Sequence, residues 1–100
     1  MIFRRGRFGD LVARQLDLFE QDEAALLREA TEAERAYDAA ERDEAEEAYG
    51  DFQLVLEAVA ERLEQVRDAY ARTLDEDTAA DYEAAFDRAA QKRHPRVRLT

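Results

Sequence analysis

The fold is decided by residues 45–70, which read AEEAYGDFQLVLEAVAERLEQVRDAY. From Ala45 onward, large apolar and aromatic side chains recur in this stretch at alternating steps of four and three residues. They are Tyr49, Phe52, Leu56, Val59, Leu63, Val66 and Tyr70. Such steps return each side chain to one face of an α-helix, as in the heptads of coiled coils. The stretch therefore predicts a long amphipathic helix, whose apolar face we call the central stripe.

A second stripe with similar spacing precedes it. Its members are Val12, Leu16, Phe19, Glu23, Leu26, Ala30, Ala33, Tyr37 and Ala40. Only Glu23 in this row is polar. We expect this helix to begin at Asp10, because an Asp side chain accepts hydrogen bonds from the first turn and Gly9 permits the preceding bend. Continued at the same spacing, the row reaches Glu44 and Glu47, so its register differs from that of the central stripe.

Three interpretations of this register change between residues 40 and 50 are open from the sequence. In the first, Gly50 ends one helix and Asp51 caps the next. That arrangement places a run of acids at a helix C-terminus, where the helix dipole disfavours them. In the second, the break lies near Asp38, where Asp38 and Glu41 mimic a capping box and the acids enrich a helix N-terminus. In the third, one helix continues through the whole region.

The last helix has clearer boundaries. Residues 75–78, DEDT, are a cluster of helix-capping residues, and an apolar face follows them. Basic Lys92 and Arg93 at its end suit the helix dipole, and Pro95 stops it. Residues 96–100 alternate in the manner of a short strand or an extended arm. Together these patterns predict a single all-α domain, either an antiparallel helical bundle or a long helical hairpin with a shorter C-terminal third helix.

Charge is divided between the ends and the body of the chain. The net charge is −10, but residues 10–90 hold eight Arg against 25 acids, a balance of −17, while residues 1–9 carry +3 and residues 91–100 carry +4. We therefore expect short basic arms at 1–9 and 93–100. Because the donor fork of Arg suits phosphate, the candidates for contact with nucleic acid are Arg4, Arg5, Arg7, Lys92, Arg93, Arg96 and Arg98.

The composition excludes several classes of protein. The chain has no Cys for disulfides or Cys-zinc sites, and no run of about 20 apolar residues that would span a membrane. With no Ser and a single histidine, His94, it is poor in the nucleophile–base pairs that covalent catalysis needs. It also lacks the Glu-x-x-His and calcium-loop patterns. We therefore expect a cytoplasmic protein that is not an enzyme and has no cofactor or metal site.

These observations favour a non-enzymatic interaction module. The central stripe, from Tyr49 to Tyr70, is the candidate interface, because Tyr and Phe are typical of the contact points that dominate binding. The first stripe thins to Ala, and few large apolar residues are left to offset chain entropy, so we predict a homodimer that also engages a protein partner. The alternative is a regulator that contacts phosphates of nucleic acid or ribosome through its basic ends.

Overall fold

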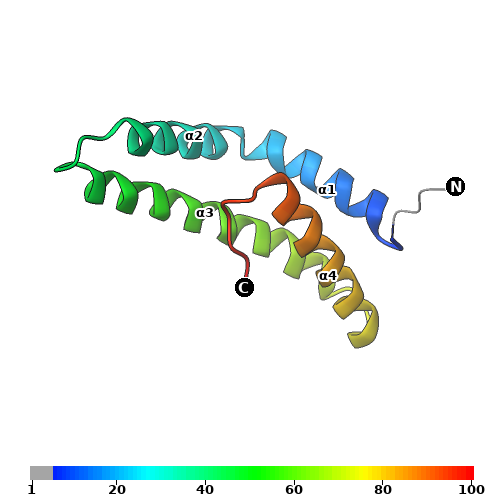
Figure 1. Cartoon of the computed structure of the whole chain (residues 1–100). Coiled ribbons are helices and arrows are strands. Elements are labelled where there is room, and N and C mark those ends of the chain that lie inside the picture. Colours follow the sequence, from blue (N-terminus) through cyan, green and yellow to red (C-terminus); the bar gives the residue numbers. More distant parts are fainter. Residues whose placement is uncertain (1–5) are drawn as a thin grey trace, which may run out of the picture.

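The structure, a computed structural model, describes residues 6–100 and confirms the all-α class. Within that range it contains four helices and no strand: α1 (Gly9–Asp22), α2 (Ala24–Ala39), α3 (Ala45–Ala71) and α4 (Glu76–Arg93). The chain runs along α1 and α2, reverses into α3, and reverses again into α4, which lies across α1 and α3 (Figure 1). None of the helices of residues 6–100 is both long enough and apolar enough to cross a bilayer.

The predicted first helix is divided in two at Glu23. This residue has φ −106° and ψ 27°, outside the helical range, and lies between the end of α1 and the start of α2. Glu23 is the one polar member of the first stripe, so the direction changes where the apolar row is interrupted. The helix also begins at Gly9, one residue earlier than predicted, and its cap position, Phe8, makes no side-chain hydrogen bond. The prediction that Asp10 starts and caps the helix is therefore wrong.

The register change occurs in residues 40–44, close to the second of the three predicted positions. Ala40 has an extended backbone, and the amide of Glu44 donates to the carbonyl oxygen of Glu41 at 2.9 Å in the turn. The acids Glu46 and Glu47 then occupy the first turn of α3, where the helix dipole favours them. The predicted capping box is wrong, because Asp38 belongs to the last turn of α2.

The boundaries of α4 are as predicted. The Asp75 carboxylate accepts hydrogen bonds from the amide of Thr78 at 2.9 Å and from its hydroxyl at 2.8 Å. The backbone bond is the first cause of a pKa of Asp75 below its ordinary value. The helix ends at Arg93, before Pro95. Residues 96–100 form no strand; they cross α3 as an irregular segment, which we call the tail (Figure 1).

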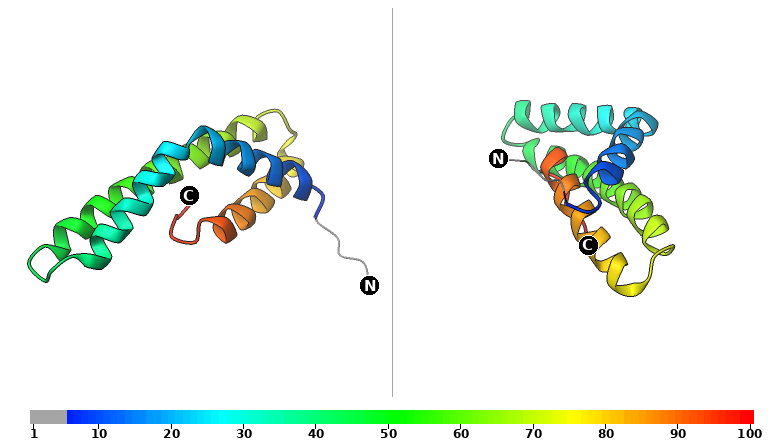
Figure 2. Two further views of the ribbon diagram at one scale, coloured as in Figure 1. Left: turned by 90° about the horizontal axis from the view of Figure 1, so that it is seen from above. Right: turned by 90° about the vertical axis from the view of Figure 1, so that its right-hand side faces the viewer.

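The core lies where α1, α3 and α4 meet. Its fully enclosed side chains come from these three helices: Val12, Leu16, Val59, Leu63, Tyr82 and Phe86. By contrast α2 contributes no buried residue, and α4 contacts α1 and α3 but not α2. The outer part of the α2–α3 hairpin lies on either side of the turn at residues 40–44 and contains Tyr37, Tyr49 and Phe52. It projects as a pair of helices without a third (Figures 1 and 2), and from here on we call this part the arm. The radius of gyration of 15.9 Å, against about 13 Å for a compact chain of this length, reflects this extension.

Candidate functional site

The central stripe, predicted as an interface, is mostly consumed by the fold of the single chain. Phe52, Leu56, Val59 and Leu63 are buried in the core. The two residues that follow in the stripe, Val66 and Tyr70, pack half-buried against that core. The stripe predicted where the helix lies but not what packs against it. Helices α1, α2 and α4 of the same chain cover most of the apolar face for which the sequence suggested a second chain. An interface through fully buried Leu63 would require the chain to open.

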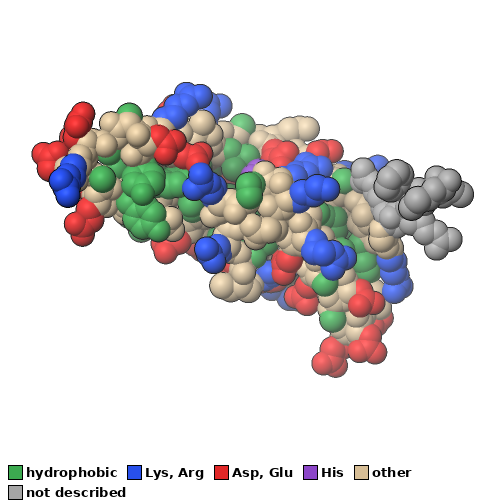
Figure 3. Space-filling view, viewed as in Figure 1, with side chains coloured by type: hydrophobic (Ala, Val, Ile, Leu, Met, Phe, Trp, Pro, Cys, Tyr) green, Lys and Arg blue, Asp and Glu red, His purple; other side chains and the backbone are tan. Residues whose placement is uncertain are grey.

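Tyr49 is the exception, and it marks the surface that remains open. Its side chain is 48 % exposed, although it is a member of the central stripe. Its ring lies 5.3 Å from that of Tyr37 on α2, and the Tyr37 ring stacks on Phe52 at 6.4 Å. These three rings form an aromatic cluster on the arm, in which Phe52 is buried, Tyr37 is partly buried and Tyr49 is exposed. Figure 3 shows a hydrophobic patch over this part of α2 and α3, flanked by charged side chains.

The aromatic cluster forms one end of a groove of about 820 Å³, which we call the arm groove. The groove follows α3 from Tyr49 to Glu64, a length of about 22 Å at 1.5 Å per residue. Its opposite end is the tail, which contributes Arg96, Arg98 and Thr100. Leu56 and Ala60 lie along its floor. The site is thus apolar and aromatic at the outer end, and at the inner end it carries both Glu61 and Glu64 and the two arginines.

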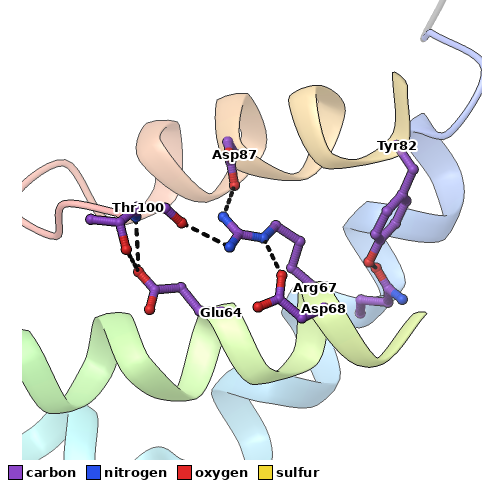
Figure 4. Close-up of polar contacts among 7 residues, drawn as sticks. Glu64, Arg67, Asp68, Tyr82, Asp87 and Thr100 are labelled. Atoms are coloured by element: carbon purple, nitrogen blue, oxygen red, sulfur yellow. Dashed lines mark hydrogen bonds and ion pairs between the residues drawn. The ribbon is translucent and has the colours of Figure 1, made fainter. Parts of the chain in front are cut away.

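Arg67 holds the tail in place (Figure 4). Its guanidinium donates to Asp68 at 2.8 Å, to Asp87 on α4 at 3.0 Å and to the carbonyl oxygen of Thr100 at 2.8 Å. Burial opposes this charge, but the hydrogen bonds and charges of the two carboxylates outweigh it and raise the pKa of Arg67 above its ordinary value. Glu64 accepts from the amide of Thr100 at 2.9 Å. These contacts join α3, α4 and the tail at one point.

The tail also has an apolar anchor. Val97 is 4 % exposed and belongs to the core, and Leu99 packs against that core half-buried. Arg96 and Arg98, which alternate with these two residues, are exposed, and Arg96 reaches Glu34 on α2 at 3.3 Å. The predicted basic arm is therefore folded onto the acidic body of its own chain, with alternate residues facing inward.

Among residues 6–100, the candidates for nucleic-acid contact do not gather into one patch. Arg93 pairs with Asp17 at 2.8 Å and Glu20 at 3.1 Å on α1, and the hydrogen bond to Asp17 is the first cause of its raised pKa. Arg7 lies at the other end of α4, where its charge helps to lower the pKa of Asp75.

Four candidates for contact with nucleic acid remain. Of these, Lys92 and Arg98 are exposed. Arg4 and Arg5 lie outside the described residues. Contact with nucleic acid thus stays a prediction, supported by fewer free charges than the sequence suggested.

The sequence predicted no catalytic or metal site, and it did not indicate what surrounds the single histidine, His94. His94 Nε2 lies 2.9 Å from a carboxylate oxygen of Glu20, and its ring meets the edge of Phe19 at 6.2 Å. The residues described, 6–100, include no group of three His, Asp or Glu side chains placed to hold a metal ion. His94 serves to fix the end of α4 against α1.

Sequence reasoning also missed two polar contacts inside the core. The Tyr82 hydroxyl donates to Gln15 Oε1 at 2.7 Å, and burial raises the pKa of Tyr82 to about 12. From the sequence, Arg67 is only one of the eight arginines of residues 10–90, with no indication that it is buried. A signal for Arg67 was present in the sequence, because it lies seven residues after Ala60 and four before Ala71, on a second apolar row of α3 whose members are buried.

At least two more grooves lie beside α1, one against α4 and one against α3. In the part of the chain that the structure describes, neither contains an exposed aromatic side chain. The exposed ring of Tyr49 therefore distinguishes the arm groove as the candidate for binding. Comparison of the chain with protein-family models, curated proteins and solved structures finds no match, so its function has to be argued from the arm groove itself.

Proposed function

We propose that this chain is a small non-enzymatic interaction module, which self-associates and engages a protein partner through the arm groove. The observation that carries the proposal is the exposed ring of Tyr49, which is packed on Tyr37 and, through it, on buried Phe52, on a pair of helices that α4 leaves uncovered. Exposed tyrosines in a groove are typical of contact points that dominate protein binding. A helical partner laid along the arm would supply the missing layer of the bundle.

Covering the exposed ring of Tyr49 is one favourable contribution to binding, set against the several kcal/mol that association itself costs. A tyrosine buries 150–250 Å² when enclosed, so covering the exposed half of Tyr49 removes on the order of 100 Å² from water. At about 25 cal/mol per Å² this is worth about 2.5 kcal/mol, or nearly a hundredfold in a binding constant. Charged groups around the groove then select the partner and its orientation.

The test compares two exposed apolar residues on the same helix. Tyr49→Asp places a charge in the arm groove, whereas Leu54→Asp changes a side chain that is 65 % exposed and lies about 140° around α3 from Tyr49. In sedimentation velocity over a concentration series, the wild-type chain should associate at high micromolar concentration. Tyr49→Asp should abolish this association and Leu54→Asp should leave it unchanged.

The converse result would contradict the proposal. If Leu54→Asp dissociates the protein and Tyr49→Asp does not, the interface lies on the opposite face of α3. Circular dichroism of both variants provides the control for folding, since neither side chain belongs to the core.

The alternative function, contact with nucleic acid or ribosome, has a separate test. Deletion of 93–100 is unsuitable, because it removes Val97 from the core and Arg93 from its ion pairs. Replacing exposed Lys92 and Arg98 by Ala leaves the fold intact and removes two positive charges. If RNA or DNA binding that falls steeply with salt is lost in this double variant, the alternative gains support over the interaction module.

A further inference from the structure

The two ends of the arm groove differ in charge. The tip of the arm, residues 38–47, contains six acids and one Arg, a net charge of −5. The inner end is mixed: Glu61 and Glu64 lie beside exposed Arg96 and Arg98, and Glu64 is already bonded to Thr100. Glu46 lies seven residues before Gln53, which lines the groove, so Glu46 occupies the same face of α3. The aromatic cluster thus has an acidic group at one side and, about 22 Å along α3, exposed Arg98 at the other.

Two such surfaces fit each other better in one orientation than in the other. If two arms lay side by side in the same direction, the acidic tips would meet and repel each other. If they lie in opposite directions about a two-fold axis, the acidic tip of each arm meets the end of the other that carries Arg98, and both contacts form at once. Two-fold contacts of identical patches are the commonest form of self-association. The aromatic clusters then cover the inner floor of the partner's groove.

We propose that the arm groove is occupied by the arm of a second copy of this chain, packed in the opposite direction about a two-fold axis. The two α2–α3 hairpins form a four-helix layer, and Glu46 of each chain lies against the partner's Arg98. This inference rests on the proposed function, and it specifies the partner and the orientation. Arg98 is preferred to Arg96 as the free cation because Arg96 already reaches Glu34 within the chain.

The same arrangement contains an unfavourable contact. Glu57 lines the groove midway between Tyr49 and Glu64, so the two-fold axis brings the Glu57 residues of both chains near each other. Two carboxylates at this point weaken the dimer. Replacing Glu57 by Gln should therefore tighten association, which would not occur if the arms met end to end.

The orientation is tested by exchanging charges in the full-length chain. Arg98→Glu and Glu46→Arg each replace an attractive pair by a repulsive one, twice in every dimer. We expect each to weaken the dimer about tenfold, since an exposed ion pair contributes up to about fivefold and occurs twice. The double variant restores the pairs with their signs reversed and should recover the wild-type dissociation constant to within about threefold. Sedimentation equilibrium measures all four constants.

The control for net charge is Arg28→Glu. It makes the same change of charge as Arg98→Glu on the outer face of α2, about 160° from Ala30, which faces the core. It should leave the dimer unchanged to within about twofold, because the charge is exposed on the face of α2 that turns away from the core, where dissolved ions screen it.

The outcomes separate the inference from the function on which it rests. If the wild-type chain dimerises and Tyr49→Asp dissociates it, but Arg98→Glu and Glu46→Arg show no compensation in the double variant, the orientation is wrong and the proposed use of the groove stands. If the wild-type chain dimerises and Tyr49→Asp has no effect, both fail. A monomer of 11.5 kDa at every concentration also overturns both.

Discussion

Replacing Arg67 by Ala should lower the free energy of unfolding by about 3 kcal/mol. The substitution removes three hydrogen bonds, to Asp68, Asp87 and Thr100. The side chains of Asp68 and Asp87 are 45 % and 44 % exposed, so water can solvate both carboxylates once Arg67 is gone. The loss of each ion pair should therefore cost about 1 kcal/mol, less than the cost of leaving a fully buried charge without its partner. The bond to Thr100 adds about 1 kcal/mol. A domain of this size has about 5–15 kcal/mol in total, so the variant still folds.

Urea unfolding followed by circular dichroism measures this loss. Arg62→Ala is the matched control, since Arg62 lies on the same helix, is 56 % exposed and reaches Glu23 only at 3.5 Å. It should cost less than about 0.5 kcal/mol. Arg67→Met removes the same three hydrogen bonds but keeps the packing of the apolar stem, so it should cost no more than Arg67→Ala. If Arg67→Ala unfolds within about 0.5 kcal/mol of the wild type, Arg67 does not hold the tail to α3 and α4.

Three further substitutions test the fold. Gly50→Ala should stabilise the protein by about 0.5–1 kcal/mol, since Gly50 is inside α3 and a Cβ there meets open space; a loss of stability in a thermal scan would contradict this. Leu63→Ala should cost about 2–5 kcal/mol in urea unfolding, because Leu63 is fully buried. Tyr82→Phe should cost about 1 kcal/mol at neutral pH through the lost bond to Gln15. Because the folded-state pKa of Tyr82 is raised from 10 to about 12, its contribution is complete below pH 10 and is lost as the pH rises towards 12. The wild type should therefore lose stability between pH 10 and 12, and Tyr82→Phe should lose less; equal slopes would refute the assignment.

The helical segments could be predicted from the sequence because their signals are local. The central stripe identified α3, and the cluster at residues 75–78 with Pro95 gave both ends of α4. The break near Asp38 was one of three open positions. The separation of α1 from α2 at Glu23 was missed, although the polar residue in the apolar row marked it.

Periodicity alone determined which face of each helix turns away from water, because side chains three and four residues apart share a face whatever the helix later meets. Only the tertiary structure decided what covers those faces. It placed α4 and the tail over the inner half of α3 and left Tyr49 open on the outer half. It also brought Arg67 to Asp87 and Thr100, which are 20 and 33 residues away. Contacts between residues so far apart leave no local pattern, since they depend on how whole helices dock.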